Sequence, residues 1–332
     1  MKHIYLLIAA VFMSVSTMAQ QRPHFSQYML NNYLLNPALS GIEDYTDVKV
    51  GFRQQWVGLE GAPSTFYVTA HTPLNKTDIA TSTVRNRNIK IKRIGIGQRA
   101  RPHHGLGVVA QADKTGPLQN TLLNASYAYH LPLNSKTKIS AGVSGGLLQY
   151  NLNPQMVHLR NQNDPTLYDN NINELKMDLN VGLWLYSKNY FVGVSGSQLL
   201  RDTGTRETQV TFNGSGNLQK HFVATAGYRI EVNPEVAVIP SFQVNYATPS
   251  PVSVDLNLKA TYADRVWVGG SLRKGDAFAG MAGINISSLL SLGYSYDITT
   301  SALTYNSAGS HEIVMGLKLQ NRGKVICPIW LW

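Results

Sequence analysis

Residues 252–262 read V-S-V-D-L-N-L-K-A-T-Y, and apolar and polar residues alternate at all 11 positions. Successive side chains of a β-strand point to opposite faces, so the stretch predicts a strand with one apolar and one polar face. An antiparallel sandwich also shows this alternation, but soluble strands average roughly 5–6 residues. A strand of about 11 residues can cross a bilayer at a tilt, and the bilayer accepts only helices and closed barrels. The stretch therefore predicts one strand of a transmembrane β-barrel.

The composition and the N-terminus fit an exported membrane protein. Charged residues make up only 14% of the 332-residue chain, whereas a typical soluble domain has about 25%. Lys2 and His3 precede residues 4–15, which are apolar apart from Ser14, and Ala19 is a small residue at a plausible cleavage point. Residues 1–19 are therefore predicted to be a secretory signal peptide that is removed near Ala19. No later run of about 18 apolar residues follows, so no transmembrane helix is expected.

Alternation and turn signals together predict an all-β fold, a transmembrane antiparallel barrel of fourteen strands. Tight turns follow even-numbered strands and longer connections mostly follow odd-numbered strands. Outer-membrane barrels have short periplasmic turns and long extracellular loops, so both termini are expected in the periplasm. The predicted strands are 47–56, 65–71, 106–112, 121–131, 138–151, 177–187, 190–199, 219–230, 236–246, 252–262, 265–273, 278–286, 290–298 and 311–319; the tight turns are 187–189, 232–235, 263–264 and 287–289; the longer connections are 152–176, 200–218 and 299–310.

The connection 72–105 departs from this rule, because it follows the second strand and is long. It carries eight basic residues against a single acid, Asp78. Three interpretations stay open: a solvated loop, a contact with anionic lipid head groups or an acidic periplasmic partner, and an error in the strand assignment. Nucleic acid is not an expected partner, because the sequence shows no recognition fold.

The sequence contains no motif of a known catalytic site. It has neither a G-x-S-x-G elbow nor an H-E-x-x-H pair, so the protein is predicted not to be an enzyme and to need no cofactor. No metal site is predicted, because His103 and His104 are adjacent and the Asn-rich loop 152–176 lacks EF-hand spacing. Cys327 is the only cysteine, which excludes an intrachain disulfide; a buried thiol, a thiol bonded to a partner and a reactive thiol all stay open.

Several longer motifs resemble a known family. Residues 24–41 read H-F-S-Q-Y-M-L-N-N-Y-L-L-N-P-A-L-S-G, residues 52–66 read F-R-Q-Q-W-V-G-L-E-G-A-P-S-T-F, and residues 71–74 read H-T-P-L. Further matching text lies at 105–118, 125–133, 309–313 and Cys327-Pro328. The chain resembles the PorP/SprF family of type IX secretion system outer-membrane proteins from Bacteroidetes.

The resemblance implies a role in protein secretion, gliding motility and attachment of cargo to the cell surface. PorP-like members belong with the core secretion machinery, whereas SprF-like members pair with individual cargo proteins that carry a C-terminal sorting domain. The sequence does not separate these branches and does not name a cargo. The leading hypothesis is a non-catalytic barrel in the bacterial outer membrane that anchors or escorts adhesin-like cargo. The alternative is a passive diffusion channel.

The apolar segment before the first strand must be buried somewhere. Asn36-Pro37 interrupts any helix there, and a fourteen-stranded barrel is wide enough to admit a plug. Residues 21–41 are therefore predicted to fold into the lumen or to dock a periplasmic partner. The expected organisation is 1–19 signal peptide, 20–46 periplasmic N-terminal segment, 47–319 barrel and 320–332 periplasmic tail.

The expected partners are the secreted cargo, type IX machinery or periplasmic components, and outer-membrane lipid. The extracellular loops would contact cargo, and the periplasmic N-terminus, basic connection and tail would contact the machinery. The residues expected at partner-binding sites are Phe25, Tyr28, Tyr33, Leu34, Asn36, Pro37, Trp56, Arg85, Arg87, Lys92, Arg93, His158, Tyr168 and Cys327.

Overall fold

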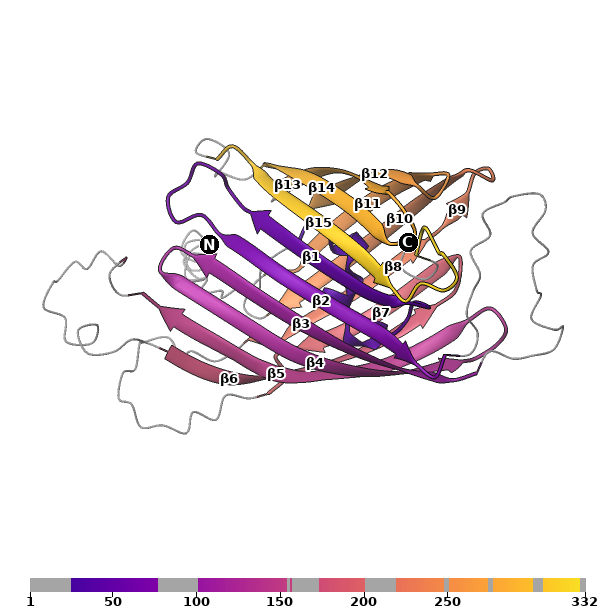
Figure 1. Ribbon diagram of the computed structural model, residues 1–332. Helices are drawn as coiled ribbons and strands as arrows, with labels where there is room; N and C mark the ends of the chain where they lie inside the picture. Colours follow the sequence, from indigo (N-terminus) through magenta and orange to yellow (C-terminus); the bar gives the residue numbers. More distant parts are fainter. Residues whose placement is uncertain are drawn as a thin grey trace, which may run out of the picture.

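The computed structural model describes residues 25–76, 101–153, 156, 173–200, 219–247, 251–273, 277–300 and 307–328. These residues form one antiparallel sheet that closes on itself into a barrel of tilted strands (Figure 1). Each strand pairs with its neighbours in the chain, and β15 returns to pair with β1, from Thr46↔Leu319 to Gln54↔His311. A closed barrel leaves no unpaired strand edge, which is the condition for strands in a bilayer.

The strand count confirms the prediction of fourteen. β8 and β9 both pair with β10, so they are one strand interrupted at Arg229. Several strands are longer than predicted, because pairing with long neighbours draws polar residues into the ladder. The bounds are β1 (Thr46–Gln54), β2 (Ser64–Leu74), β3 (His103–Thr115), β4 (Leu118–Pro132), β5 (Lys138–Leu152), β6 (Asn173–Tyr186), β7 (Tyr190–Ser197), β8 (His221–Tyr228), β9 (Ile230–Glu231), β10 (Val236–Ala247), β11 (Ser253–Tyr262), β12 (Val266–Arg273), β13 (Ala277–Asn285), β14 (Leu290–Thr299) and β15 (Ser310–Leu319).

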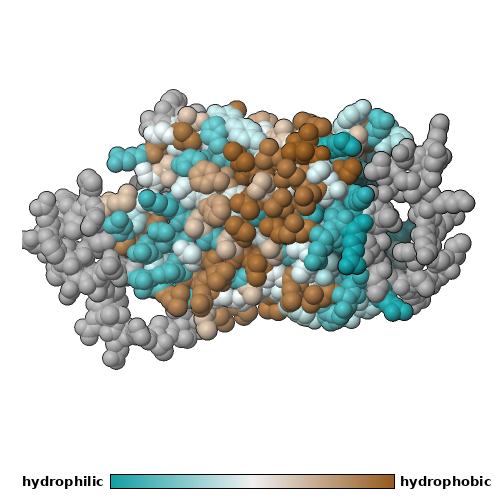
Figure 2. Space-filling model, viewed as in Figure 1, coloured by the Kyte–Doolittle hydropathy of each residue, from teal (hydrophilic) through white to brown (hydrophobic). Residues whose placement is uncertain are grey.

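Along β11, apolar side chains point outward and polar side chains point inward, as in a membrane barrel. Leu256 and Leu258 are exposed on the outer surface, whereas Asp255, Asn257 and Lys259 are buried in the interior. The same inversion repeats around the barrel, and Figure 2 shows apolar side chains across the middle of the outer surface with polar side chains toward both ends. An apolar band between polar rims is the outer face of a transmembrane barrel.

The two ends of the barrel differ. We call the end with Thr46, Leu319 and the short turns 133–137, 187–189, 232–235, 263–265 and 286–289 the turn end. The opposite end, with Gln54, Ser310 and the two-residue turn 116–117 between β3 and β4, is the loop end. In Figure 1 the turn end lies on the right and the loop end on the left. β2 and β3 pair directly as far as Leu74↔His104, so no strand of the sheet lies between them. The basic residues of that connection at 77–100 lie outside the described residues.

Residues 25–45, which we call the luminal segment, lie inside the barrel (Figure 1). They contain three short 3₁₀ helices, η1 (Tyr28–Leu30), η2 (Asn32–Leu34) and η3 (Pro37–Leu39). Asn36 caps η3, because its side chain accepts a hydrogen bond from Ala38 N–H and Pro37 occupies the first helical position. Among the described residues, no helix is long and apolar enough to span a membrane.

Candidate functional site

The luminal segment runs along the inside of the barrel. Ser26 contacts Glu312 and Asp297 in the loop-end half, and Ser40 contacts His130 near the turn end. The apolar core of the molecule consequently lies in the lumen, where Tyr33 and Leu39 pack with Trp184 and other inward side chains. Of the two locations considered for this segment, its described part occupies the lumen.

A cluster of three charged side chains holds the first residues of this segment, and we call Arg53, Asp297 and Glu312 the arginine anchor. Arg53 Nη2 lies 2.8 Å from Asp297 Oδ2, and Nη1 lies 3.2 Å from Glu312 Oε2. Ser26 N–H donates to Glu312 Oε2 at 2.8 Å, and the Ser26 hydroxyl donates to Asp297. Tyr67 O–H also donates to Glu312, at 3.0 Å. Buried charges require such pairing and hydrogen bonding.

Neutral hydrogen bonds hold the middle of the luminal segment. Asn36 Nδ2 donates to the carbonyls of Leu183 and Val194, both at 3.1 Å. Asn31 Nδ2 donates to the Thr69 hydroxyl at 3.0 Å. Burial raises the pKa of Tyr33, so its hydroxyl stays protonated while it bonds to the wall. These contacts satisfy polar backbone and side-chain groups that water would otherwise bind.

Three histidines form hydrogen bonds with the end of the luminal segment. Two of them, His71 and His130, were not among the residues that the sequence analysis expected at a site. His130 Nε2 donates to the Ser40 carbonyl at 2.7 Å, and His103 Nε2 donates to the Gly41 carbonyl at 3.2 Å. Gly41 N–H donates to His71 Nδ1 at 3.3 Å. The alternation of side chains along each strand could have identified them, because each histidine occupies an inward-facing position of its strand.

Glycines let the luminal segment approach the wall closely. A Cβ at position 105 would lie 1.8 Å from the Ser40 carbonyl oxygen, and a Cβ at position 142 would lie 2.5 Å from the Ala38 backbone. Both distances are far below van der Waals contact. Gly105 and Gly142 therefore mark places where backbone packs on backbone.

We expect Gly105→Ala to lower the free energy of unfolding by roughly 1–3 kcal/mol, the usual cost of an overpacked site. Gly280→Ala is the matched control, because that strand glycine has no heavy atom within 4 Å of its ideal Cβ position. Urea unfolding of the reconstituted barrel measures both variants. Identical urea midpoints of unfolding for the two variants would show that the close contact between Gly105 and Ser40 does not contribute to stability.

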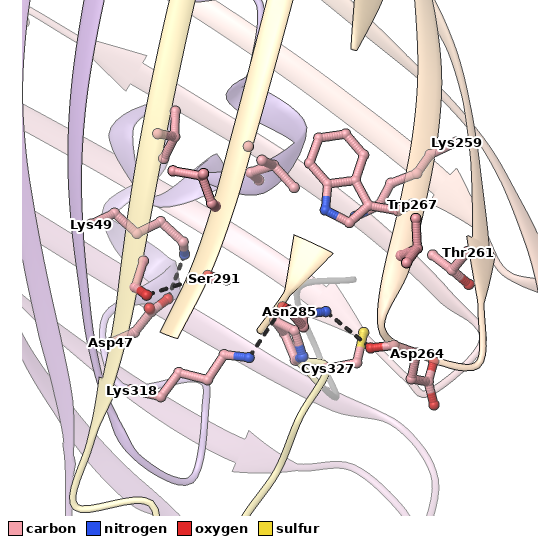
Figure 3. A pocket seen from close by; sticks show the side chains of 17 residues that line it. Asp47, Lys49, Lys259, Thr261, Asp264, Trp267, Asn285, Ser291, Lys318 and Cys327 are labelled. Atoms are coloured by element: carbon pink, nitrogen blue, oxygen red, sulfur yellow. Dashed lines mark hydrogen bonds and ion pairs between the residues drawn. The ribbon is translucent and has the colours of Figure 1, made fainter. Parts of the chain in front are cut away.

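A cavity of about 40 Å³ lies beside the luminal segment at the turn end (Figure 3). Lys49 donates to Asp47, and Lys318 donates to Asn285 and to the Ile326 carbonyl. The lining residues are Leu30, Asp47, Lys49, Lys259, Thr261, Asp264, Val266, Trp267, Asn285, Ser291, Leu292, Gly293, Val314, Gly316, Lys318, Cys327 and Pro328.

The tail after β15 folds back against this cavity. Val325 is buried, and its N–H donates to the Asn321 side chain at 2.9 Å. Cys327 is half-buried at the cavity, and removal from water raises the pKa of its thiol. The described residues contain no group of three or more His, Cys, Asp or Glu side chains that could hold a metal ion.

A family described as "Type IX secretion system membrane protein PorP/SprF" matches residues 17–317. The chain belongs to the PorP/SprF family. The closed barrel and this family place the PorP/SprF protein in the outer membrane as a component of type IX secretion, which implies association with the secretion machinery. The family and the fold are those of a membrane barrel and not of a known enzyme family.

Solved structures similar to this PorP/SprF barrel include an outer-membrane protein, a transporter and a channel. Omp33 of Acinetobacter baumannii has a TM-score of 0.48 and 8% identity over 84% of this chain and 100% of its own. The toluene transporter TbuX of Ralstonia pickettii has a TM-score of 0.47 and 9% identity, and the match covers 89% of this chain and 94% of the transporter. The monoaromatic hydrocarbon channel CymD has a TM-score of 0.47 and 12% identity, and the match covers 91% of this chain and 95% of the channel. No curated protein sequence matches the chain.

The structure separates the predicted partner-binding residues into three places. Trp56 lies near the loop end with φ 48°, and its N–H donates to the Ser310 hydroxyl at 3.1 Å. Cys327 lines the turn-end cavity. Arg85, Arg87, Lys92, Arg93, His158 and Tyr168 lie outside the described residues. The six that lie together in the lumen are Phe25, Tyr28, Tyr33, Leu34, Asn36 and Pro37.

Proposed function

We propose that this barrel anchors or escorts secreted cargo at the cell surface and does not conduct solutes on its own. The observation that carries the proposal is the lumen occupied by residues 25–45, whose side chains are hydrogen-bonded to the wall from the arginine anchor to the histidines. A passive diffusion channel needs a water-filled lumen. Membership of a type IX secretion family supports the cargo role.

The proposal includes an orientation. Outer-membrane barrels have short turns on the periplasmic side, which favours the turn end as the periplasmic end. Cargo with a C-terminal sorting domain would then contact the loop end, where Trp56 lies and where β5 ends and β6 begins on either side of the sequence that contains His158 and Tyr168. Machinery and anionic lipid would contact the turn end, where β2 ends and β3 begins on either side of the sequence that contains Arg85, Arg87, Lys92 and Arg93.

Affinity purification of the tagged protein from solubilised outer membranes of the source bacterium tests the cargo role. We expect mass spectrometry to identify a large secreted protein with a C-terminal sorting domain, and we expect deletion of the barrel gene to remove that protein from the cell surface. A similarly tagged, unrelated outer-membrane barrel is the control. Recovery of neither a sorting-domain protein nor a machinery component would contradict the proposal.

A further inference from the structure

The turn-end cavity contains a buried cation that the cargo role does not explain. Lys259 lies on β11, its side chain points into the barrel, and it is only 4% exposed. Its ammonium group lies 5.1 Å from the centre of the Trp267 ring. Within the part of the chain that the structure describes, no oxygen atom accepts a hydrogen bond from it. An ammonium group removed from water normally requires an acceptor or an opposite charge.

The acidic groups of the same cavity already have cationic partners. Asp47 is paired with Lys49 and lies 3.6 Å from His71 Nε2. Asp264 is 3.1 Å from Arg229, a cation from outside the cavity lining. The cavity therefore has an excess of positive charge, and Lys259 makes a cation–π contact with the indole ring of Trp267.

The remaining candidate for a counter-charge is Cys327. Burial raises the pKa of this thiol above its ordinary value, although Lys259 acts in the opposite direction. The thiol is therefore neutral near pH 7, because a raised pKa keeps the proton on sulfur. A neutral thiol does not compensate an ammonium group.

Hydrogen-bond donors and space are available in the cavity that Lys259 lines. Among the residues that the structure describes, Lys318 donates to the neutral oxygens of Asn285 and Ile326 and forms no ion pair with a carboxylate. Thr261 and Ser291 add hydroxyl groups to the lining. The volume of about 40 Å³ accepts a group the size of about three water molecules. The Asp264 side chain lines the cavity and is 55% exposed, which connects the cavity to solvent at the turn end.

We propose that this cavity is a binding site for a small oxyanion, a carboxylate or phosphate group, with the Lys259 ammonium as its principal ligand and Lys318 as a second cation in the cavity lining. The group is either a free anion or the carboxylate end of a polypeptide that enters at the turn end. An oxyanion would supply the charge and the acceptor atoms that Lys259 lacks. The site is independent of the cargo role, because it involves the opposite end of the barrel.

The test uses the full chain in lipid nanodiscs at constant ionic strength, with sodium chloride exchanged for the probe. The probes are acetate, inorganic phosphate, and a short peptide with either a free or an amidated C-terminus. Tryptophan fluorescence reports binding, because Trp267 packs on Lys259. We expect a saturable change in the wild type and an affinity at least about tenfold lower in Lys259→Gln. Lys136→Gln is the control, since Lys136 is an exposed lysine in a turn at the same end.

Each outcome has a defined meaning. Saturation by acetate or phosphate supports a site for free anions, and saturation only by the peptide with the free carboxylate supports a polypeptide terminus. Without any probe, Lys259→Gln should unfold at the same or a higher temperature than the wild type, because the uncompensated charge is gone. The proposal is overturned if no probe gives a saturable change, or if Lys259→Gln binds the probes as the wild type does.

Discussion

Deletion of residues 21–41 is expected to turn a poorly conducting barrel into an open channel, with single-channel conductance in planar bilayers rising roughly tenfold or more. The physical reason is that the luminal segment occupies the space between the walls. Asn36 bonds to carbonyls of both β6 and β7, and Ser140 of β5 bonds to the Ala38 carbonyl. Without the segment, that space fills with water and ions.

The barrel itself should survive the deletion. Inward positions such as Ser126, Ser140 and Thr69 are polar, so water can replace the hydrogen bonds that they make to the luminal segment. Outward apolar side chains still face lipid, and the strand ladder from β1 to β15 does not depend on the segment. Buried aromatic residues such as Trp184 would become wet, so some loss of stability is expected.

Two controls make this result interpretable. The heat-dependent shift of the barrel on gels reports that the deletion variant has folded. A synthetic peptide of residues 21–41, added in trans, should lower the current again, whereas a scrambled peptide of the same composition should not. A folded deletion variant with unchanged conductance would refute the idea that the segment closes the lumen.

The strands were predictable because lipid imposes a strict pattern on them. Along β11, every second residue must be apolar to face lipid, so alternation alone locates the strand and its inward side chains. Even the interrupted strand β8–β9 was predicted as one strand, since a break at Arg229 changes the pairing locally and leaves the alternation on either side. The lengths of the connections then distinguished the end of the barrel that carries both termini from the opposite end.

The contacts inside the lumen were not predictable from the same pattern. The alternation along each strand predicts that Arg53, Asp297 and Glu312 face inward. However, Arg53 lies on β1 and the two carboxylates lie on β14 and β15, so the three side chains meet only when β15 pairs with β1 and closes the barrel. Which inward groups meet depends on the stagger of strands around the barrel and on the path of the luminal segment. His71 and His130 lie within stretches that resemble the family, but the sequence does not show that their side chains meet the luminal segment, for the same reason. The unusual feature that sequence did reveal was the apolar segment itself.

Arg53→Gln is expected to destabilise the folded barrel by about 3–5 kcal/mol, the usual cost of breaking a buried ion pair from one side. The substitution leaves Glu312, which is 0% exposed, and Asp297, which is 2% exposed, without their cation. It also removes a donor to the Ser26 hydroxyl. Glutamine is shorter than arginine, so the substitution removes the charge and also part of the packing around the guanidinium group.

Arg229→Gln provides the comparison, because Arg229 pairs with an exposed Asp264 at the same kind of distance, 3.1 Å. An exposed pair contributes about 0–1 kcal/mol. Urea unfolding of the reconstituted barrel, followed by gel mobility, should therefore separate the two arginine variants by several kcal/mol.

A triple variant separates charge from shape. Arg53→Gln combined with Asp297→Asn and Glu312→Gln has no buried charge in the arginine anchor, so it should regain most of the stability that the single variant loses, because a neutral replacement of a whole buried pair is often tolerated. The same triple variant should still hold Ser26 less firmly, since hydrogen bonds to neutral amides are weaker than those to carboxylates. If Arg53→Gln costs no more than Arg229→Gln, the arginine anchor contributes little to the fold. If the triple variant is no more stable than the single one, the loss comes from packing around the guanidinium and not from the uncompensated carboxylates.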